Sequence, residues 1–161
     1  MHCGTTQTAS SVVSSRRSCS SNNLFTNCMS SSSATRYILY ADDDADDREM
    51  FETAFHAHPQ FVLCTFPDAA ALLRFLEEKE PGIEVCLIIS DINMPRVSGI
   101  ELLSLVKAQP LYRLTPFMLL TTAGSPRELE RALELRTVVV PKPHTLKGFG
   151  ELMQLLLKYS G

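Results

Sequence analysis

The sequence predicts an α/β fold in which five helices cover both faces of a doubly wound five-stranded parallel sheet. Short apolar runs alternate with amphipathic stretches from Arg36 onward, a pattern typical of consecutive βαβ units. The chain of 161 residues has room for one domain and a tail, and 45% of its residues are hydrophobic, which suffices for a packed core. We therefore expect a single domain over residues 36–161.

The apolar runs have the length and composition of buried strands, and the segments between them carry apolar residues at helical spacing. The predicted strands are 37–41, 60–65, 85–90, 116–121 and 137–140. Helices are expected at 47–57, 69–79, from about 126, and 146–159. The helix from about 126 begins with a capping box formed by Ser125 and Glu128. The core-facing stripes of the helices are Met50, Phe51, Ala54 and Phe55, then Leu72, Leu73, Phe75 and Leu76, and last Phe149, Leu152, Met153 and Leu156.

Residues 1–35 are rich in Ser, Thr and Asn and contain no acidic residue, since Asp42 is the first in the chain. Such a segment buries too little apolar surface to offset its ordering entropy, so we expect a disordered N-terminal tail. Arg16 and Arg17 give the tail a charge of +2, which leaves −5 for the remainder of a chain whose net charge is −3. The same composition also fits an organellar transit peptide.

Charge and cysteine usage exclude several classes of function. The isoelectric point near 5.8 leaves no basic excess to neutralise phosphates, so we expect no nucleic acid and no membrane surface as partner. The five cysteines show no spacing typical of a zinc site or a disulfide framework. Cys64 and Cys86 fall in apolar segments and are predicted to be small buried hydrophobes of a protein in the reducing cytoplasm.

Reactive side chains follow the predicted strands at the points where each strand ends. Carboxyl ends of parallel strands meet at one edge of a sheet, and in a flavodoxin-like order the strands converge near a switch point. The residues placed there are Asp42, Asp43 and Asp44 after the first strand, Asp91 after the third, Thr121 and Thr122 after the fourth, and Lys142 and Pro143 after the fifth.

Clustered carboxylates repel one another, and a hard divalent cation such as Mg²⁺ relieves the repulsion. A phosphoryl group on Asp91 would add charge that the metal and the Lys142 ammonium offset, while the Thr121 hydroxyl donates a hydrogen bond. The sequence thus predicts a phosphoryl-handling site. Asp44, Asp46 and Asp47 are interpreted instead as the N-cap and first-turn acids of a helix.

Four segments together, ILYADDDADDREMF, SDINMPRVSGIELL, PFMLLTTAG and VVVPKP, resemble the motifs of bacterial two-component response-regulator receiver domains, especially the single-domain, chemotaxis-regulator-like kind. The resemblance covers about residues 36–159, and the D-x-x-M-P-x-x-x-G run from Asp91 to Gly99 is its most specific part. It implies that Asp91 is the phosphoacceptor and that Asp42 and Asp43 hold Mg²⁺ with Asp91 and the Asn93 carbonyl.

The resemblance further implies that Thr121 is the switch hydroxyl, with Thr122 as its rival, and that Lys142 precedes a cis bond to Pro143. Gly99 is expected to allow the turn into the third helix. One departure is Val139, which occupies the position where such domains commonly carry a Tyr or Phe that changes rotamer.

As a receiver of a phosphorelay, the chain would take a phosphoryl group from a sensor histidine kinase or a histidine phosphotransfer protein. It would catalyse its own aspartyl phosphorylation and dephosphorylation and is not expected to be a conventional enzyme. Because the sequence contains no output domain, we expect it to act on a downstream protein target through its surface or to pass the group on.

Two alternatives use the same residues. A receiver-fold binding module that is never phosphorylated would keep the fold alone. A haloacid-dehalogenase-like phosphatase would use Asp42 and Asp44 as a D-x-D pair, but it leaves the run from Asp91 to Gly99 unexplained. A flavodoxin-like flavin carrier is disfavoured because the acids after the first strand would repel the cofactor phosphate.

Overall fold

Five parallel strands form one sheet in the order β2-β1-β3-β4-β5 in the computed structural model, which describes residues 35–56, 58–80, 82–122 and 125–159. The predicted tail over residues 1–35 lies outside the described residues except for Thr35, which begins the first strand. The strands are β1 (Thr35–Ala41), β2 (Val62–Phe66), β3 (Ile83–Asp91), β4 (Phe117–Thr121) and β5 (Val138–Pro141).

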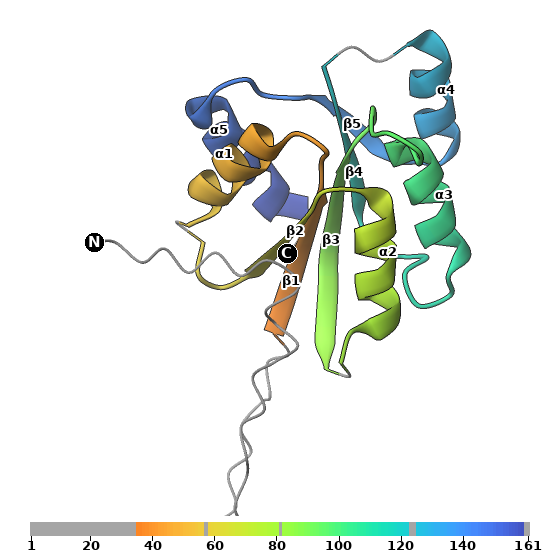
Figure 1. The fold of residues 1–161 in the computed structure, drawn as a ribbon, viewed down its shortest axis with the longest axis horizontal. Coiled ribbons are helices and arrows are strands. Elements are labelled where there is room, and N and C mark those ends of the chain that lie inside the picture. The colour runs from red at the N-terminus through yellow and green to blue at the C-terminus, as the bar shows by residue number, and fades with distance from the viewer. Residues whose placement is uncertain (1–34, 57, 81, 123–124, 160–161) are drawn as a thin grey trace, which may run out of the picture.

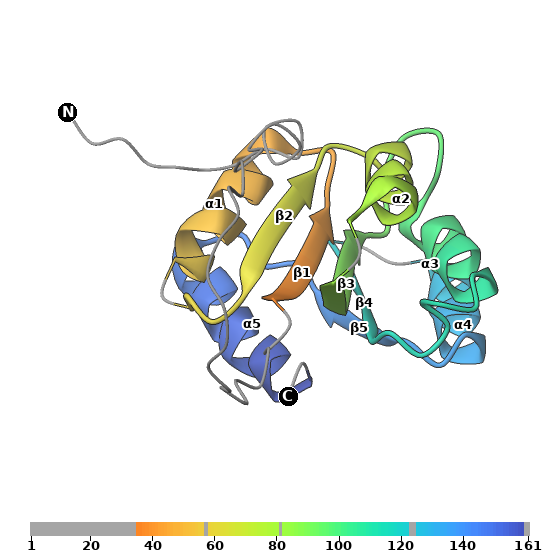
Figure 2. The same cartoon turned by 90° about the horizontal axis from the view of Figure 1, so that it is seen from below.

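Helices cover both faces of the sheet, as Figures 1 and 2 show. One face carries α1 (Ala45–Phe55) and α5 (Leu146–Tyr159); the other carries α2 (Ala69–Glu78), α3 (Gly99–Ala108) and α4 (Pro126–Glu134). Strands and helices alternate strictly along the chain, so the predicted doubly wound α/β fold is confirmed. None of the helices in the described part of the chain is long and apolar enough to span a membrane.

Several boundaries differ from the prediction for local reasons. Helix α1 begins at Ala45 instead of residue 47, because the Asp44 carboxylate caps it by accepting the Asp46 and Asp47 backbone N–H groups. Strand β2 begins at Val62 because residues 58–61 form a turn closed by the Phe61 N–H on the His58 carbonyl. Strand β3 extends to Asp91, so this carboxylate stands on the last residue of a strand and not in the loop after it.

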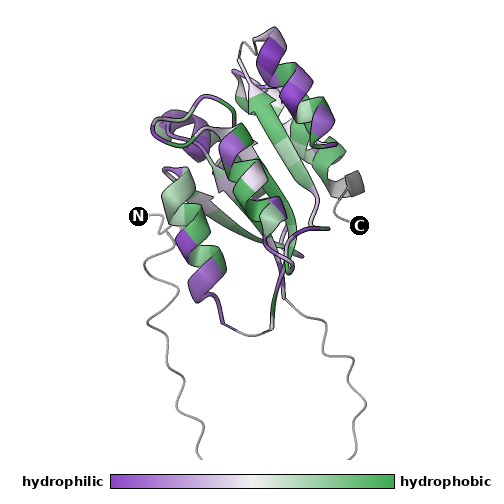
Figure 3. Ribbon diagram, turned by 90° about the vertical axis from the view of Figure 1, so that its right-hand side faces the viewer, coloured by the Kyte–Doolittle hydropathy of each residue, from purple (hydrophilic) through white to green (hydrophobic). Residues whose placement is uncertain are grey.

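The core consists of one apolar cluster on each face of the sheet. Figure 3 shows hydrophobic residues along the strands, whereas the helices carry both hydrophobic and hydrophilic residues. The predicted helix stripes face these clusters: Phe51, Phe55, Leu72 and Leu76 are buried, and so are all four stripe residues of α5. Cys64 and Cys86 are free and buried as predicted, and burial raises the pKa of the Cys64 thiol to about 11.

Glycine is required at position 99 because the backbone there packs closely against the Asp91 carbonyl, and not because of the turn that the sequence suggested. Among the described glycines only Gly82, at φ 95°, has a left-handed backbone. A Cβ atom added at Gly99 would lie 2.1 Å from the Asp91 carbonyl oxygen. The Gly99 N–H also donates to the Ile92 carbonyl at 2.9 Å, which keeps the start of α3 against the end of β3.

Replacing Gly99 by alanine should lower the free energy of unfolding by about 1–3 kcal/mol, because the Asp91 backbone has to move. Urea denaturation measures this loss. Gly150→Ala is the matched control: nothing lies within 4 Å of its added Cβ. That variant should gain roughly 0.5–1 kcal/mol, since alanine is the better helix former. Equal losses in the two variants would contradict the steric explanation.

Candidate functional site

The side chains predicted at the strand ends lie together at the carboxyl edge of the sheet. Asp42 follows β1, Asp91 ends β3, Thr121 ends β4 and Lys142 follows β5. Their strands are consecutive neighbours in the sheet, and the Lys142 N–H donates to the Thr121 carbonyl at 2.8 Å. The parallel register therefore places residues that are up to 100 positions apart (142 − 42) in one site.

Three carboxylates of this edge form a cluster. Asp42, Asp43 and Asp91 each offer an oxygen, and these oxygens lie within 4.8 Å of one another. Asp42 is fully buried and Asp91 is 5% exposed, whereas Asp43 is open to solvent. Two buried carboxylates beside an exposed one provide a set of oxygen ligands of the kind that Mg²⁺ prefers.

The Asp42 carboxylate is held by three neighbours. Its Oδ2 accepts a hydrogen bond from the Tyr40 hydroxyl and lies 2.8 Å from Lys142 Nζ, while its Oδ1 accepts the Asp44 N–H at 3.0 Å. The Tyr40 ring stacks on Phe51 with centroids 4.3 Å apart. Burial, together with the neighbouring Asp42 charge and hydrogen bond, raises the pKa of Tyr40 far above its ordinary value, so the hydroxyl stays a donor.

Lys142 is the buried cation of the site. Its Nζ lies 2.8 Å from Asp42 Oδ2, 2.6 Å from Asp47 Oδ2 and 4.0 Å from Asp91 Oδ1. Burial by itself lowers the pKa of this ammonium, but the hydrogen bonds to Asp42 and Asp47 outweigh burial and hold the pKa above its ordinary value. Lys142 is therefore a fixed positive charge at neutral pH.

Asp91 is bonded through only one of its oxygens. Its Oδ2 accepts the Asn93 N–H at 3.1 Å, whereas its Oδ1 is buried and has no hydrogen-bond partner. Burial raises the pKa of the Asp91 carboxyl; Lys142 lowers it and Asp42 raises it further, and the net shift is upward. Buried polar atoms in native proteins nearly always have hydrogen-bond partners, so an unpartnered oxygen at this edge identifies a candidate ligand site.

The Thr121 hydroxyl is the second buried oxygen without a partner, whereas the rival Thr122 is exposed to solvent. Of the two threonines, Thr121 is thus the one with a buried and unpartnered hydroxyl at this edge of the sheet. Val139 pairs with Leu119 in the sheet and packs, partly buried, against the cluster on the α2 side. An aliphatic side chain takes the place of the aromatic ring there.

Two expectations about individual residues need correction. The bond between Lys142 and Pro143 is trans, because the described residues contain no cis peptide bond. The trans isomer is the lower in energy by about 0.5–1 kcal/mol, and with it Lys142 Nζ already reaches Asp42 and Asp47. Asp47, interpreted as a first-turn acid alone, does lie in the first turn of α1, but its carboxylate also binds Lys142.

Sequence reasoning missed Tyr40 and Asp47. A signal for Tyr40 existed, because residues two apart on extended backbone share a face and Asp42 directly follows β1. Nothing comparable identified Asp47. Its partner lies 95 positions away (142 − 47), and six other acids stand within five positions of it, at 42, 43, 44, 46, 49 and 52.

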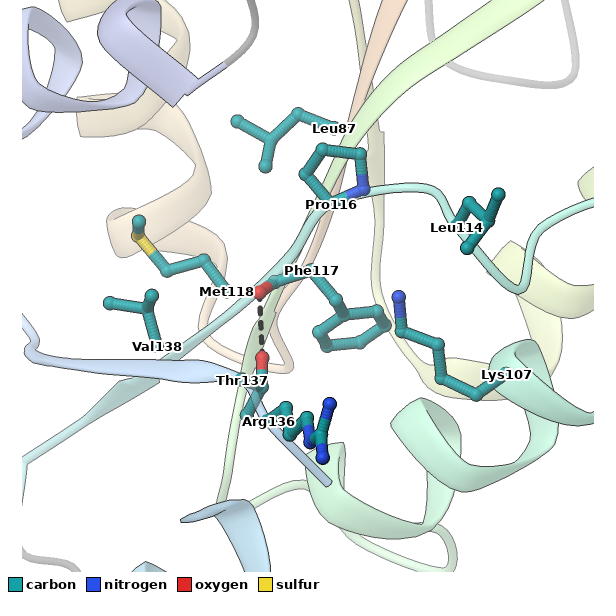
Figure 4. A pocket seen from close by; sticks show the side chains of 9 residues that line it. All are labelled: Leu87, Lys107, Leu114, Pro116, Phe117, Met118, Arg136, Thr137 and Val138. Atoms are coloured by element: carbon teal, nitrogen blue, oxygen red, sulfur yellow. Dashed lines mark hydrogen bonds between the residues drawn. The ribbon is translucent and has the colours of Figure 1, made fainter. Parts of the chain in front are cut away.

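A separate cavity lies at the opposite end of β4 and β5. It has a volume of about 270 Å³ and is drawn in Figure 4, where the Thr137 hydroxyl donates to the Phe117 carbonyl at 2.6 Å. Its lining includes the amino-terminal residues of these two strands, with Lys107 and Arg136 as its charged groups. No carboxylate lines this cavity, so it is unrelated to the acidic cluster.

Comparison with known proteins agrees with this geometry. The family described as "Response regulator receiver domain" matches residues 38–152. The probable chemotaxis protein CheY of Rhizobium etli is 37% identical over 111 residues, which are 68% of this chain and 83% of that protein. The solved structure of Vibrio cholerae chemotaxis protein CheY4 has a TM-score of 0.64 at 26% identity and covers 78% of this chain and 99% of that one.

Other relatives are much longer than the matched region. Chemotaxis protein CheV2 of Helicobacter pylori is 30% identical over 115 residues, which are 70% of this chain but only 36% of that protein. The chain likewise spans 28% of a protein-glutamate methylesterase/protein-glutamine glutaminase of Rhodopseudomonas palustris. Strand order, acidic edge and family match point the same way. The chain belongs to the response regulator receiver domain family, whose members are phosphoacceptors in two-component signalling.

Proposed function

We propose that Asp91 accepts the phosphoryl group, from a sensor histidine kinase or a histidine phosphotransfer protein. The observation that carries this proposal is the Asp91 Oδ1 atom, which is buried at the acidic edge, lies 4.0 Å from Lys142 Nζ and has no hydrogen-bond partner. In the transfer a carboxylate oxygen of Asp91 forms a bond to phosphorus while the P–N bond of phosphohistidine breaks. The electron pair of that bond stays on the imidazole.

The same cluster fits a magnesium ion. Asp42, Asp43 and Asp91 would supply carboxylate oxygens, and the Asn93 backbone carbonyl would add a fourth protein ligand, as the family resemblance implies. When bound, Mg²⁺ would offset the charge of the phosphoryl oxygens during transfer. Support comes from the cluster itself, because carboxylates this close repel one another without a cation.

Lys142 and Thr121 would stabilise the product. The Lys142 ammonium is charged, buried and at the cluster, so it would offset charge added at Asp91 without first losing a shell of water. The Thr121 hydroxyl is buried without a partner and would donate to a phosphoryl oxygen. Thr121 ends β4, the strand that borders Asp91, and Lys142 directly follows β5, the next strand along, so the sheet positions both groups beforehand.

The signal would pass to a downstream protein target, and the reaction would take place in the cytoplasm. Free thiols at Cys64 and Cys86 agree with a reducing compartment. The alternative function, a binding module that is not phosphorylated, keeps the same fold. The phosphatase alternative loses its second acid, because the Asp44 carboxylate is occupied in capping α1.

Incubation with acetyl phosphate and Mg²⁺ should add one phosphoryl group to Asp91, and Asp91→Asn should abolish the addition, because the amide cannot act as the acceptor. Intact mass and mapping of the modified peptide measure this. Asp44→Asn is the control, since asparagine caps a helix as well as aspartate does. A wild-type protein that stays unlabelled would favour the binding module instead.

Asp43→Ala should weaken Mg²⁺ binding by about tenfold or more, because the accessible ligand of the cluster is lost. Its unfolding temperature should stay the same or rise, since Asp43 is exposed and its removal reduces repulsion. Calorimetric titration with MgCl₂ and a thermal scan measure the two quantities. Wild-type affinity in this variant would show that Asp43 is not a ligand.

Without metal, Asp91→Asn should be more stable than the wild type near pH 7, by an amount that decreases on acidification. The pKa of Asp91 is raised in the folded state, so the native protein binds this proton more tightly than the unfolded chain. Protonation of Asp91 therefore stabilises the folded wild type. This stabilisation is fully present below about pH 4 and is lost as the pH rises through the folded pKa. Urea denaturation in EDTA at several pH values tests this. A difference that does not vary with pH would indicate another cause.

A further inference from the structure

The ammonium of Lys142 is shared unequally among three carboxylates. It binds Asp47 at 2.6 Å and Asp42 at 2.8 Å, but it lies 4.0 Å from Asp91, beyond hydrogen-bond distance. The carboxylate that would receive the phosphoryl group is thus the one to which Lys142 is not bonded.

Asp42 and Asp47 hold Lys142 in different ways. The Asp42 carboxylate is fixed by two further donors, the Tyr40 hydroxyl and the Asp44 N–H. The Asp47 carboxylate accepts no hydrogen bond from any other described residue, and its side chain is 17% exposed. Of the two contacts, the one to Asp47 is therefore the easier to exchange.

The position of Asp47 is not explained by capping of α1. The Asp44 carboxylate already accepts the Asp46 and Asp47 backbone N–H groups, at 2.8 and 3.3 Å. Asp46 provides the first-turn acid that favours a helix start, and its side chain is exposed. What sets Asp47 apart from Asp46 is its contact with Lys142.

We propose that Asp47 is a positioning residue that holds the Lys142 ammonium away from Asp91, and that Lys142 exchanges Asp47 for the phosphoryl group when Asp91 is phosphorylated. This inference rests on the proposed function. An ammonium has three donors, and Asp42 can keep one of them throughout. The added negative charge at Asp91 would attract the Lys142 ammonium. The Asp47 carboxylate at the start of α1 would then lose its contact with Lys142.

The exchange makes Asp47 a competitor of the phosphorylated state. A ligand shifts an equilibrium only by the difference in its contacts between two states, and here the contact between Asp47 and Lys142 belongs to the unphosphorylated one. Removing the Asp47 charge should therefore favour binding of a phosphoryl mimic. A purely structural Asp47 would change stability alone, and an Asp47 that aims Lys142 at the phosphoryl group would weaken such binding when removed.

Beryllium fluoride in saturating Mg²⁺ serves as the phosphoryl mimic, and calorimetric titration gives its affinity. Asp47→Asn should bind it about threefold tighter than the wild type, the factor expected for removal of one competing, partly exposed ion pair. Asp46→Asn removes the same charge from the same helical turn without touching Lys142, and its affinity should equal that of the wild type. The comparison separates the exchange from a general charge effect.

The ¹⁵N signal of the Lys142 ammonium reports the exchange directly. It should move when the wild type binds beryllium fluoride, and in Asp47→Asn without ligand it should already be displaced toward the bound position. Equal or weaker affinity in Asp47→Asn, with a wild type that binds, would overturn the exchange and leave the proposed function intact. A wild type that does not bind beryllium fluoride would overturn both.

Discussion

The arrangement at the carboxyl edge of the sheet depends on one buried positive charge, that of Lys142. Carboxylates from β3, from the loop after β1 and from α1 all lie within 4.0 Å of this ammonium. Without it, two buried acids would face one another in a medium of low dielectric, where uncompensated charge is expensive. Hydrogen bonds to Asp42 and Asp47 keep the ammonium charged despite its burial.

The sheet makes this concentration of charge possible at little conformational cost. Asp42, Asp91 and Thr121 end or directly follow strands that are largely buried in the apolar core, and Lys142 directly follows the more exposed β5. Tight packing continues into the loop after β3, where Gly99 leaves no space beside the Asp91 carbonyl. The backbone at Asp91 is thus closely packed, while its side-chain Oδ1 is buried without a hydrogen-bond partner.

The fold could be predicted from the sequence because its signals are local. Alternating apolar runs identify strands, stripes such as that of α5 identify buried helix faces, and strand ends in a parallel sheet share one edge. The contacts of Asp47 could not be predicted, because they depend on which of several neighbouring acids a distant lysine reaches. The role of Gly99 was misjudged for a similar reason. The sequence indicates only that glycine is conformationally flexible, whereas the close packing of Gly99 against the Asp91 carbonyl is a feature of the folded structure.

The hydrogen bond from Tyr40 to Asp42 has a practical consequence for spectroscopy. The chain contains no tryptophan and four tyrosines, so its near-ultraviolet absorption and emission are dominated by very few chromophores. One of these, Tyr40, is completely buried, stacks on Phe51 and bonds directly to a carboxylate of the acidic cluster. A change in the charge or ligation of that carboxylate alters the environment of the phenol, so the protein carries a native optical probe within its own site.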